Sequence, residues 1–396
     1  MSVESIESAP ESTTQFPKGR RKGLLYLLMF MITLALLLVT GELLARFFVK
    51  LQPIPDPPPA RTFDPYKENI YIVQMRPYVY YHIPGSRYTQ ARSYYQVDYE
   101  INSMGFRGPE IQPKSDDVKR LIVISDSIGE GHGNKYDETY PYQLGENLRE
   151  QGWEVVNMSV QGASPIYYAA NIKRYLSVEP DAVLIMTFEN ELSDDRVIES
   201  VYSTFPFLDD EEALLMRTST RALLSKSRLY LLLQKGWRYF EHSPVDDLIL
   251  QNRQVTYTQA EQDAMAAFKK LSPLTYLVAP EVLEKQWRMT QTYLDHTVSS
   301  FQQQGIPVMV ANMALIGPYF SQVHRDYVYS LDEKITGWAS AAKLPFFSLL
   351  PVIDNAFKEH PHSKISIEDD GHPTPYTHAL IERTLRPWVV KNLNLE

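Results

Sequence analysis

Residues 120–129 read Arg-Leu-Ile-Val-Ile-Ser-Asp-Ser-Ile-Gly, and this stretch decides the fold class of the chain. The run from Leu121 to Ile124 is continuously apolar over the length of a short strand. Such a run is typical of a strand that is buried on both faces of a parallel sheet. A sharp Asp-Ser turn follows, which places Ser127 at the carboxyl end of the strand, where open α/β sheets bind their ligands.

The same pattern continues downstream, because short apolar runs alternate with amphipathic segments. Further strands are expected at 153–158, 181–188, 306–312 and 344–349, and helices at 141–150, 166–176, 282–304 and 375–390. Strands that alternate with helices form right-handed βαβ units whose helices cover both faces of a parallel sheet. The sequence therefore predicts an α/β fold, a three-layer α/β/α sandwich around a five-stranded parallel sheet of the flavodoxin-like kind.

The segment 196–280 interrupts this alternation. It is too long for a plain loop, and it holds helical patterns at 211–217, 222–239 and 259–271. We predict a helical cap inserted over one end of the sheet. We expect the apolar stretch 229–233 to pack into a core, with contact to a membrane surface as the alternative.

The first 48 residues predict a membrane anchor. Residues 1–22 form a polar, disordered tail that ends in a basic cluster, and residues 23–41 contain no charge. A transmembrane helix is expected at 23–48, since this length nearly spans the hydrocarbon core of a bilayer. The apolar region of a cleaved signal peptide, the alternative, would be shorter. Four basic residues precede the span and two follow it, so the tail is expected in the cytoplasm and the body outside it, in the periplasm of a diderm bacterium.

Two segments connect the anchor to the body. Residues 49–63 form a Pro-rich linker, with five prolines between 52 and 60, and are expected to be stiff and extended. Residues 64–118 form a lead-in that holds nine tyrosines between 64 and 100. Alternation near 94–101 predicts a strand, and the tyrosines are interpreted as residues of half-buried strands, with stacking on sugar rings as the alternative.

Charge and cysteine content exclude several classes of function. The chain has 39 basic and 48 acidic residues, a net charge of −9. Residues 1–50 hold six basic and four acidic side chains, so the rest of the chain carries −11. An acidic body does not neutralise phosphates, and nucleic acid is not expected as a partner. The absence of cysteine excludes disulfides, Cys-ligated metal and a Cys nucleophile.

Four polar blocks follow predicted strands or precede the last helix, and in a parallel sheet they converge on one edge. They contain Ser127, then Gly162, then Asn190, and finally Asp369 with His372. In order and spacing these blocks resemble the SGNH (GDSL-like) hydrolase family, over about 119–195 and 281–390, which makes 119–396 the expected hydrolase-like domain. The stretch Asn-Ser-Met-Gly-Phe-Arg at 102–107 is similar to the lead-in of membrane-anchored members.

The resemblance implies a catalytic triad and an oxyanion hole. Ser127 would be the nucleophile, His372 its general base and Asp369 the carboxylate that orients the imidazole. Gly162 and Asn190 would donate hydrogen bonds to the oxyanion. The sequence leaves Asp370 open as an alternative to Asp369.

Two blocks depart from the family pattern. Ser125 stands where the family has glycine, and the third block reads Phe-Glu-Asn-Glu at 188–191, without its usual glycine and aspartate. These departures concern the substrate more than the activity, because the residues that would do the chemistry are present.

The remaining histidines are interpreted as structural. His378 is expected to pack or cap at the start of the last helix, and His132 is expected to be a loop residue, with contact to substrate as the alternative. His360 and His362 resemble a metal pair, but a third ligand at suitable spacing is missing, so no metal and no cofactor are assigned.

These observations predict a membrane-anchored serine esterase or O-acyltransferase that acts on an extracytoplasmic glycan or another envelope ester through an acyl-Ser127 intermediate. The acyl group would be acetyl. The alternatives are a lipase or phospholipid esterase, and a non-catalytic envelope-binding or assembly protein on the same fold.

Overall fold

The structure is a computed structural model of the 396-residue chain. It describes residues 18–48, 62–63, 71–75, 78–82, 84–92, 94–196, 227, 229, 233, 244–252, 257–271, 278–315, 321–368 and 370–395.

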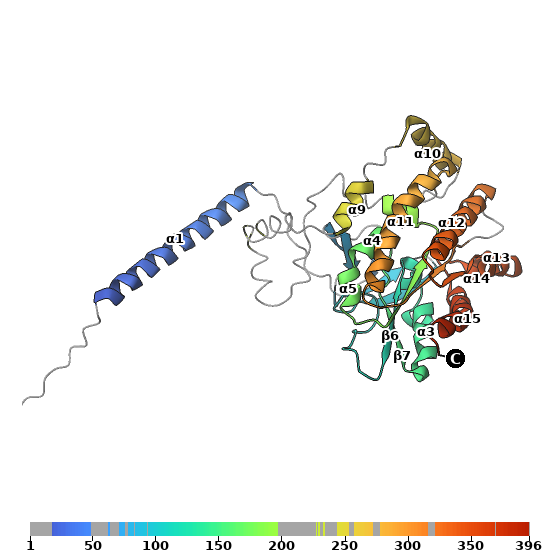
Figure 1. The fold of residues 1–396 in the computed structure, drawn as a ribbon, viewed down its shortest axis with the longest axis horizontal. Helices are drawn as coiled ribbons and strands as arrows, with labels where there is room; N and C mark the ends of the chain where they lie inside the picture. The colour runs from blue at the N-terminus through green and yellow to red at the C-terminus, as the bar shows by residue number, and fades with distance from the viewer. Residues whose placement is uncertain are drawn as a thin grey trace, which may run out of the picture.

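A five-stranded sheet forms the centre of the body (Figure 1). Its strands are β6 (Lys119–Ile124), β7 (Trp153–Asn157), β8 (Ala182–Thr187), β9 (Val308–Asn312) and β10 (Phe346–Ser348). All neighbours pair in parallel, in the order β10-β9-β8-β6-β7. This is the flavodoxin-like order, so the predicted fold class is confirmed. The order reverses between β6 and β8, and Ser127 follows the first of these two strands.

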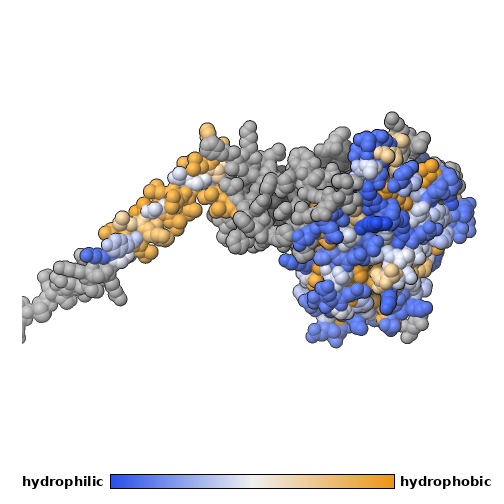
Figure 2. Space-filling view, turned by 45° about the horizontal axis from the view of Figure 1, so that its top comes forward, coloured by the Kyte–Doolittle hydropathy of each residue, from blue (hydrophilic) through white to orange (hydrophobic). Residues whose placement is uncertain are grey.

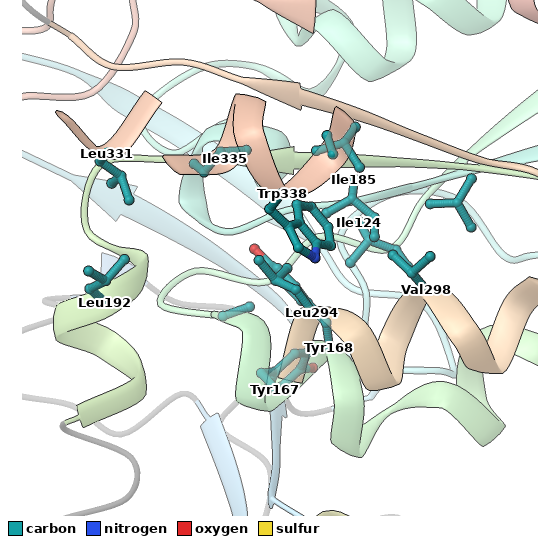
Figure 3. Close-up of a cluster of buried hydrophobic side chains, with 14 of the residues drawn as sticks. Ile124, Tyr167, Tyr168, Ile185, Leu192, Leu294, Val298, Leu331, Ile335 and Trp338 are labelled. Carbon is teal, nitrogen blue, oxygen red and sulfur yellow. The ribbon is translucent and has the colours of Figure 1, made fainter. Parts of the chain in front are cut away.

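Helices cover both faces of the sheet. One face carries α4 (Pro165–Ala170), α5 (Ile172–Leu176), α11 (Pro280–Gln302) and α12 (Gln322–Ala341), and the other carries α3 (Tyr140–Leu148), α13 (Leu350–Glu359) and α15 (Pro375–Asn392). Within β6, Ile122 and Ile124 pack into the first layer, while Leu121 and Val123 pack into the second. This alternation explains why the whole strand is apolar. Figure 3 shows Ile124 of β6 among side chains of the first layer.

Short elements complete the domain. They are α2 (Ser127–Glu130), η1 (Tyr136–Glu138), η2 (Arg149–Gln151) and α14 (His362–Ile365).

Two elements differ from the sequence-based expectation. The helix expected at 166–176 is divided into α4 and α5, because the Asn171 side-chain amide donates to the Tyr167 carbonyl at 2.9 Å and so competes with the regular backbone bonds. The 20-residue helix α12 was not predicted. Its buried residues Tyr327, Val328, Leu331 and Ile335 have helical spacing, which is the signal that marks it.

The lead-in forms small sheets of its own. Strands β4 (Arg87–Ala91) and β5 (Gln96–Glu100) pair antiparallel, and β1 (Thr62–Phe63) adds to β4 in parallel. The strands β2 (Tyr71–Met75) and β3 (Tyr78–His82) form a separate hairpin. Tyr88 and Tyr99 are buried, and their stacked ring centroids lie 5.0 Å apart. The structural interpretation of these two tyrosines is confirmed.

Part of the expected cap is described. Helix α10 (Gln259–Leu271) lies where a helix was predicted, and α9 (Pro244–Asn252) precedes it. Val245 and Ile249 of α9 pack on α4 and α11, that is, on one helical layer of the sandwich. The helices expected at 211–217 and 222–239 lie outside the described residues, apart from Ser227, Leu229 and Leu233.

Helix α1 (Lys18–Phe48) extends away from the body, and its apolar surface contrasts with the polar surface of the body (Figure 2). Leu25–Phe47 is long and apolar enough to cross a membrane, with a mean hydropathy of 2.3. Near the end of this helix, the Glu42 carboxylate accepts hydrogen bonds from the Ser227 hydroxyl at 2.7 Å and the Leu229 backbone N–H at 2.9 Å. The helix therefore contacts the inserted segment.

Candidate active site

Ser127 is the first residue of the four-residue helix α2, directly beyond β6. Asp126 caps this helix, since its carboxylate accepts the Ile128 N–H at 2.9 Å. Gly131 ends the helix in a left-handed conformation with φ of +81°. The turn is packed so tightly against Ser159 that a Cβ on Gly129 would collide with it, which explains glycine two residues after the serine.

His372 contacts Ser127 from the loop that precedes α15. Its Nε2 lies 2.9 Å from the Ser127 Oγ, and its Nδ1 is hydrogen-bonded to the Asp370 carboxylate. The Ser127 residue is 6% exposed and the His372 side chain 21% exposed, so solvent reaches the imidazole. The sequence separates Ser127 and His372 by 245 residues, and the fold brings them into hydrogen-bonding contact.

The described partner of the imidazole is Asp370, which the sequence left open as an alternative to Asp369. Asp369 itself lies outside the described residues. The two-residue spacing follows from the turn: Gly371 has φ of +81°, and the Ile367 N–H donates to the His372 carbonyl at 2.7 Å. The chain direction reverses at this turn, which brings the His372 side chain back beside the carboxylate of Asp370.

A second histidine borders the pair. His132 is buried, and its ring centroid lies 4.2 Å from that of His372. Its Nε2 lies 3.0 Å from the Tyr95 hydroxyl oxygen and 3.6 Å from the Asp370 carboxylate. The Tyr95 hydroxyl in turn donates to Asp370 at 3.2 Å. The sequence favoured a plain loop residue at 132, and nothing in the sequence pattern linked Tyr95 to the site.

Gly162 lies in the loop after β7, which is tied to the nucleophile helix. The Gln161 N–H donates to the Glu130 carboxylate at 2.5 Å, and the Val160 N–H donates to the Ser125 carbonyl at 3.1 Å. Gly162 has φ of +74°, a conformation that favours glycine. The loop that carries it is thereby held beside the helix of Ser127.

Asn190 follows β8, the other strand at the switch in sheet order. Its side-chain amide donates to Asp194 at 2.8 Å. Asn190 also partly offsets the rise that burial causes in the pKa of Asp126, the neighbour of Ser127. The flanking residues are anchored on both sides: Glu189 lies 3.1 Å from the imidazole Nε2 of His324, and Glu191 accepts the Tyr168 hydroxyl at 3.0 Å. Glu191, the departure from the family pattern, thus has a buried structural contact.

The carboxyl groups around the site fall into two groups, one with lowered and one with raised pKa values. Burial would raise the pKa of Asp370, but the neighbouring imidazoles of His132 and His372 hold this pKa well below its ordinary value. Asp370 is therefore an anion that stabilises an imidazolium. In contrast, burial raises the pKa of Asp126 to about 6, and burial together with neighbouring acids raises the pKa of Glu191 and Asp194. The carboxyls behind the site thus resist ionisation.

The other histidines have structural contacts. His378 is buried and its Nδ1 accepts the Tyr140 N–H at 3.3 Å, which confirms a packing and capping role; burial lowers its pKa to about 3. His360 and His362 lie against the rings of Tyr376 and Phe357, with centroid distances of 5.3 and 5.5 Å.

Within the described residues, one group of side chains has the proximity of metal ligands: His132, Asp370 and His372, whose ligand atoms lie within 4.8 Å of one another. The imidazole nitrogens of His372 are already bonded to Asp370 and Ser127. The contacts therefore describe a proton relay, and we assign no metal to them.

Comparisons with known proteins return structural likenesses. No family model and no curated protein matches the chain. Among solved structures, a protein named TesA has 14% identity and a TM-score of 0.39, over 69% of this chain and 99% of its own. A lipolytic protein of the G-D-S-L family from Desulfitobacterium hafniense has 11% identity and a TM-score of 0.38, over 68% and 98%. An acetylxylan esterase from Geobacillus stearothermophilus has 13% identity and a TM-score of 0.39, over 68% and 93%. Identities and scores of this size do not assign a substrate.

Proposed function

We propose that this chain is a membrane-anchored serine esterase or O-acyltransferase that acts on an acylated glycan or another ester outside the cytoplasm. The observation that carries the proposal is the continuous contact from Ser127 through His372 to Asp370 at the carboxyl edge of the sheet, at the switch in strand order. In this proposal Asp370, rather than Asp369, is the carboxylate that orients the His372 imidazole.

The acylation step uses the geometry as it stands. The Ser127 Oγ attacks the acyl carbonyl while its proton passes to Nε2 of His372, 2.9 Å away. The resulting imidazolium is stabilised by ionised Asp370 at Nδ1. Collapse of the tetrahedral intermediate breaks the ester bond, and the proton on Nε2 goes to the leaving alcohol, which leaves acyl-Ser127.

The deacylation step repeats these proton transfers with a second hydroxyl compound. Water or a sugar hydroxyl gives its proton to Nε2 of His372 and attacks the acyl carbon. The bond between the acyl carbon and the Ser127 Oγ then breaks, and Nε2 returns the proton to Oγ. Water yields a free carboxylic acid, and a sugar hydroxyl yields a new ester. The same three side chains serve both outcomes.

The negative oxygen of the tetrahedral intermediate needs donors. In the proposed hole these are the backbone N–H groups of Ser127 and Gly162 and the Asn190 amide. The loops of Gly162 and Asn190 follow β7 and β8, which flank β6 in the sheet. Asn190 would release its bond to Asp194 when substrate is bound; burial, Asp126 and Asp195 raise the pKa of Asp194, which favours its neutral form.

Fluorophosphonate labelling of the full-length chain in detergent micelles tests this proposal. We expect labelling and p-nitrophenyl acetate hydrolysis by the wild type, and loss of both in Ser127→Ala. The matched control is Ser177→Ala, an exposed serine after α5, which should be labelled like the wild type. Labelling that persists in Ser127→Ala, or a wild type without any turnover, would support a binding protein instead.

Substrate chemistry separates the two reactions. Release of acetate from an acetylated polysaccharide identifies an esterase, whereas transfer from an acyl donor to the bare polysaccharide identifies a transferase. A reporter fused after Glu396 tests the proposed topology: activity of a reporter that works only in the cytoplasm would overturn the extracytoplasmic placement.

A lipid ester is the second candidate substrate, and it is favoured by the contact between α1 and the insertion. Glu42 binds Ser227 and Leu229 near the end of the candidate span, and Leu233, four residues after Leu229 in the chain, is 61% exposed. An exposed leucine at that position would lie at the lipid surface. If lipid is the substrate, Leu233→Ser should lower turnover of an ester embedded in phosphatidylcholine vesicles and leave p-nitrophenyl acetate hydrolysis unchanged.

A further inference from the structure

The carboxylate of Asp370 is held from two sides. One side is the imidazole of His372, as described above. On the other side, the Tyr95 hydroxyl donates to Oδ2 of Asp370 at 3.2 Å, and the His132 imidazole lies beyond it. Tyr95 directly precedes β5 in the lead-in, 275 residues from Asp370, so the contact joins two distant parts of the chain.

The protons in this network can be placed by elimination. An ionised carboxylate only accepts hydrogen bonds, so the single hydroxyl proton of Tyr95 points to Asp370. The Gln161 Oε1 likewise only accepts, so the Nδ1 of His132, 3.2 Å away, carries the single proton of the neutral imidazole. The Nε2 of His132 is then an acceptor, 3.0 Å from the Tyr95 hydroxyl oxygen and 3.4 Å from the Gln90 amide nitrogen. Burial and the neighbouring His372 lower the pKa of His132, while burial and Asp370 raise the pKa of Tyr95. Both groups therefore stay neutral, so that Tyr95 donates to Asp370 and His132 donates to Gln161.

The loop of His132 is fixed by the nucleophile helix itself. The backbone N–H of His132 donates to the Ser127 carbonyl at 3.0 Å, and its Nδ1 lies 3.2 Å from the side-chain carbonyl oxygen Oε1 of Gln161. The imidazole is thus oriented by the same turn that presents the nucleophile. A displacement of Tyr95 would leave one oxygen of Asp370 with a poorer donor.

We infer that Tyr95 and His132 are positioning residues that hold the Asp370 carboxylate for His372, and that the lead-in is therefore a component of the active site rather than a spacer. This inference rests on the proposed function. It assigns to the Tyr-rich segment a role in setting the basicity of the catalytic imidazole.

Tyr95→Phe in the full-length chain tests the inference, because it removes one hydroxyl and keeps the ring. The loss of one hydrogen bond to a charged group should lower kcat/KM about 10- to 100-fold. Without Tyr95, the charge of Asp370 acts more strongly on His372, so the acid limb of the pH profile should move to higher pH by about half a unit or more. The titratable groups that interact with the charge of His372 are Asp370, His132, Asp126 and His378, and Tyr95→Phe leaves all four in place.

Tyr94→Phe is the matched control, since this neighbouring tyrosine is 50% exposed and should retain wild-type kinetics. His132→Gln is a second variant that keeps a side-chain donor. It should also move the acid limb of the pH profile to higher pH, by less than Tyr95→Phe does. The inference is overturned if Tyr95→Phe and Tyr94→Phe have the same kcat/KM and the same pH midpoint.

A readout that does not need turnover separates this inference from the proposed function. The His372 imidazole can be titrated by NMR with histidine-selective labelling, because the chain has nine histidines and His372→Gln identifies its signal. A chain without Ser127-dependent turnover would refute the esterase proposal, yet an upward shift of the His372 titration in Tyr95→Phe would still support the positioning role. An unchanged titration would refute the positioning role, whatever the activity.

Discussion

The short helix α2 has a histidine–carboxylate pair at each end, and the two pairs differ in chemistry. At its first residue, Ser127 meets His372 and Asp370. At its last residue, Glu130 lies 3.0 Å from Nε2 of His82, and both side chains have no solvent exposure. Tyr88 lies 3.1 Å from the other nitrogen of His82, whereas Ser127 occupies that position at His372. The His372–Asp370 pair has solvent access and a serine hydroxyl beside its imidazole, and we call it the reactive pair. The His82–Glu130 pair has neither, and we call it the supporting pair.

The pKa directions follow this division. Burial would raise the pKa of Glu130, but His82, the Gln161 N–H and Arg107 hold it below the ordinary value. Glu130 is thus a buried anion with several fixed donors. Asp370 is also an anion, but its partner imidazole remains open to solvent and substrate.

The largest effect is expected at the reactive end of α2. Asp370→Asn should lower kcat by ~10⁴, because the amide no longer stabilises the imidazolium and can select the wrong tautomer of His372. The melting temperature should change little. Hydrolysis of p-nitrophenyl acetate by the full-length chain gives the measurement. Asp369→Asn is the matched control, and if it has the larger effect, the carboxylate of the triad is Asp369.

The next effect concerns the oxyanion. Asn190→Ala should lower kcat by ~10²–10³ with little change in KM, since the lost donor acts mainly on the transition state. Steady-state kinetics over a range of ester concentrations provides the test. A variant with raised KM and wild-type kcat would show that Asn190 binds the ground state instead.

The supporting end of α2 should respond in stability. Glu130→Gln leaves His82 without its anionic partner and is expected to cost about 3 kcal/mol of unfolding free energy. Thermal unfolding at pH 7 should show a fall of about 5–10 °C. Because the folded pKa of Glu130 is lowered, its stabilising contribution is present at neutral pH and is lost as the pH falls below about 4.5. The difference in melting temperature between Glu130→Gln and the wild type should therefore become smaller at acid pH. A Glu130→Gln enzyme with normal stability and no activity would contradict the division between the two pairs.

The smallest effect is expected from Asp126, which caps the helix between these regions. Its folded pKa of about 6, against an ordinary 3.8, means that the folded state holds the extra proton between these values. Stability should thus fall as the pH rises through that window. Asp126→Asn keeps a cap acceptor without the charge, so its melting temperature should gain a few degrees on the wild type between pH 4 and pH 7. A constant difference across this range would refute the raised pKa.

Local pattern predicted most of the sheet domain. The strands from β6 to β9 are apolar enough to be read directly, and the polar blocks that follow them mark the carboxyl edge. The residue types leave Asp369 and Asp370 open as the partner of His372, and the contact of Asp370 depends on the backbone of the turn, where Gly371 has φ of +81°. The contact of Tyr95 with Asp370 spans 275 residues and depends on how the lead-in docks, so no periodicity or spacing reveals it.

Arg107 shows how that docking is secured. Its buried guanidinium donates to the carbonyls of Gly131 and Asn134 at 2.8 and 2.6 Å, and to the Glu130 carbonyl at 3.2 Å. The lead-in is thereby fixed to the loop behind the nucleophile helix, on the path by which the chain runs from α1 into the body. His82 and Tyr95, which come earlier in the chain than Arg107, add contacts to Glu130 and Asp370. If α1 is held in a membrane as proposed, all three lead-in contacts lie between the anchor and the sheet along the chain, so a pull on the anchor would act on residues around the proposed active site as well as on the sheet.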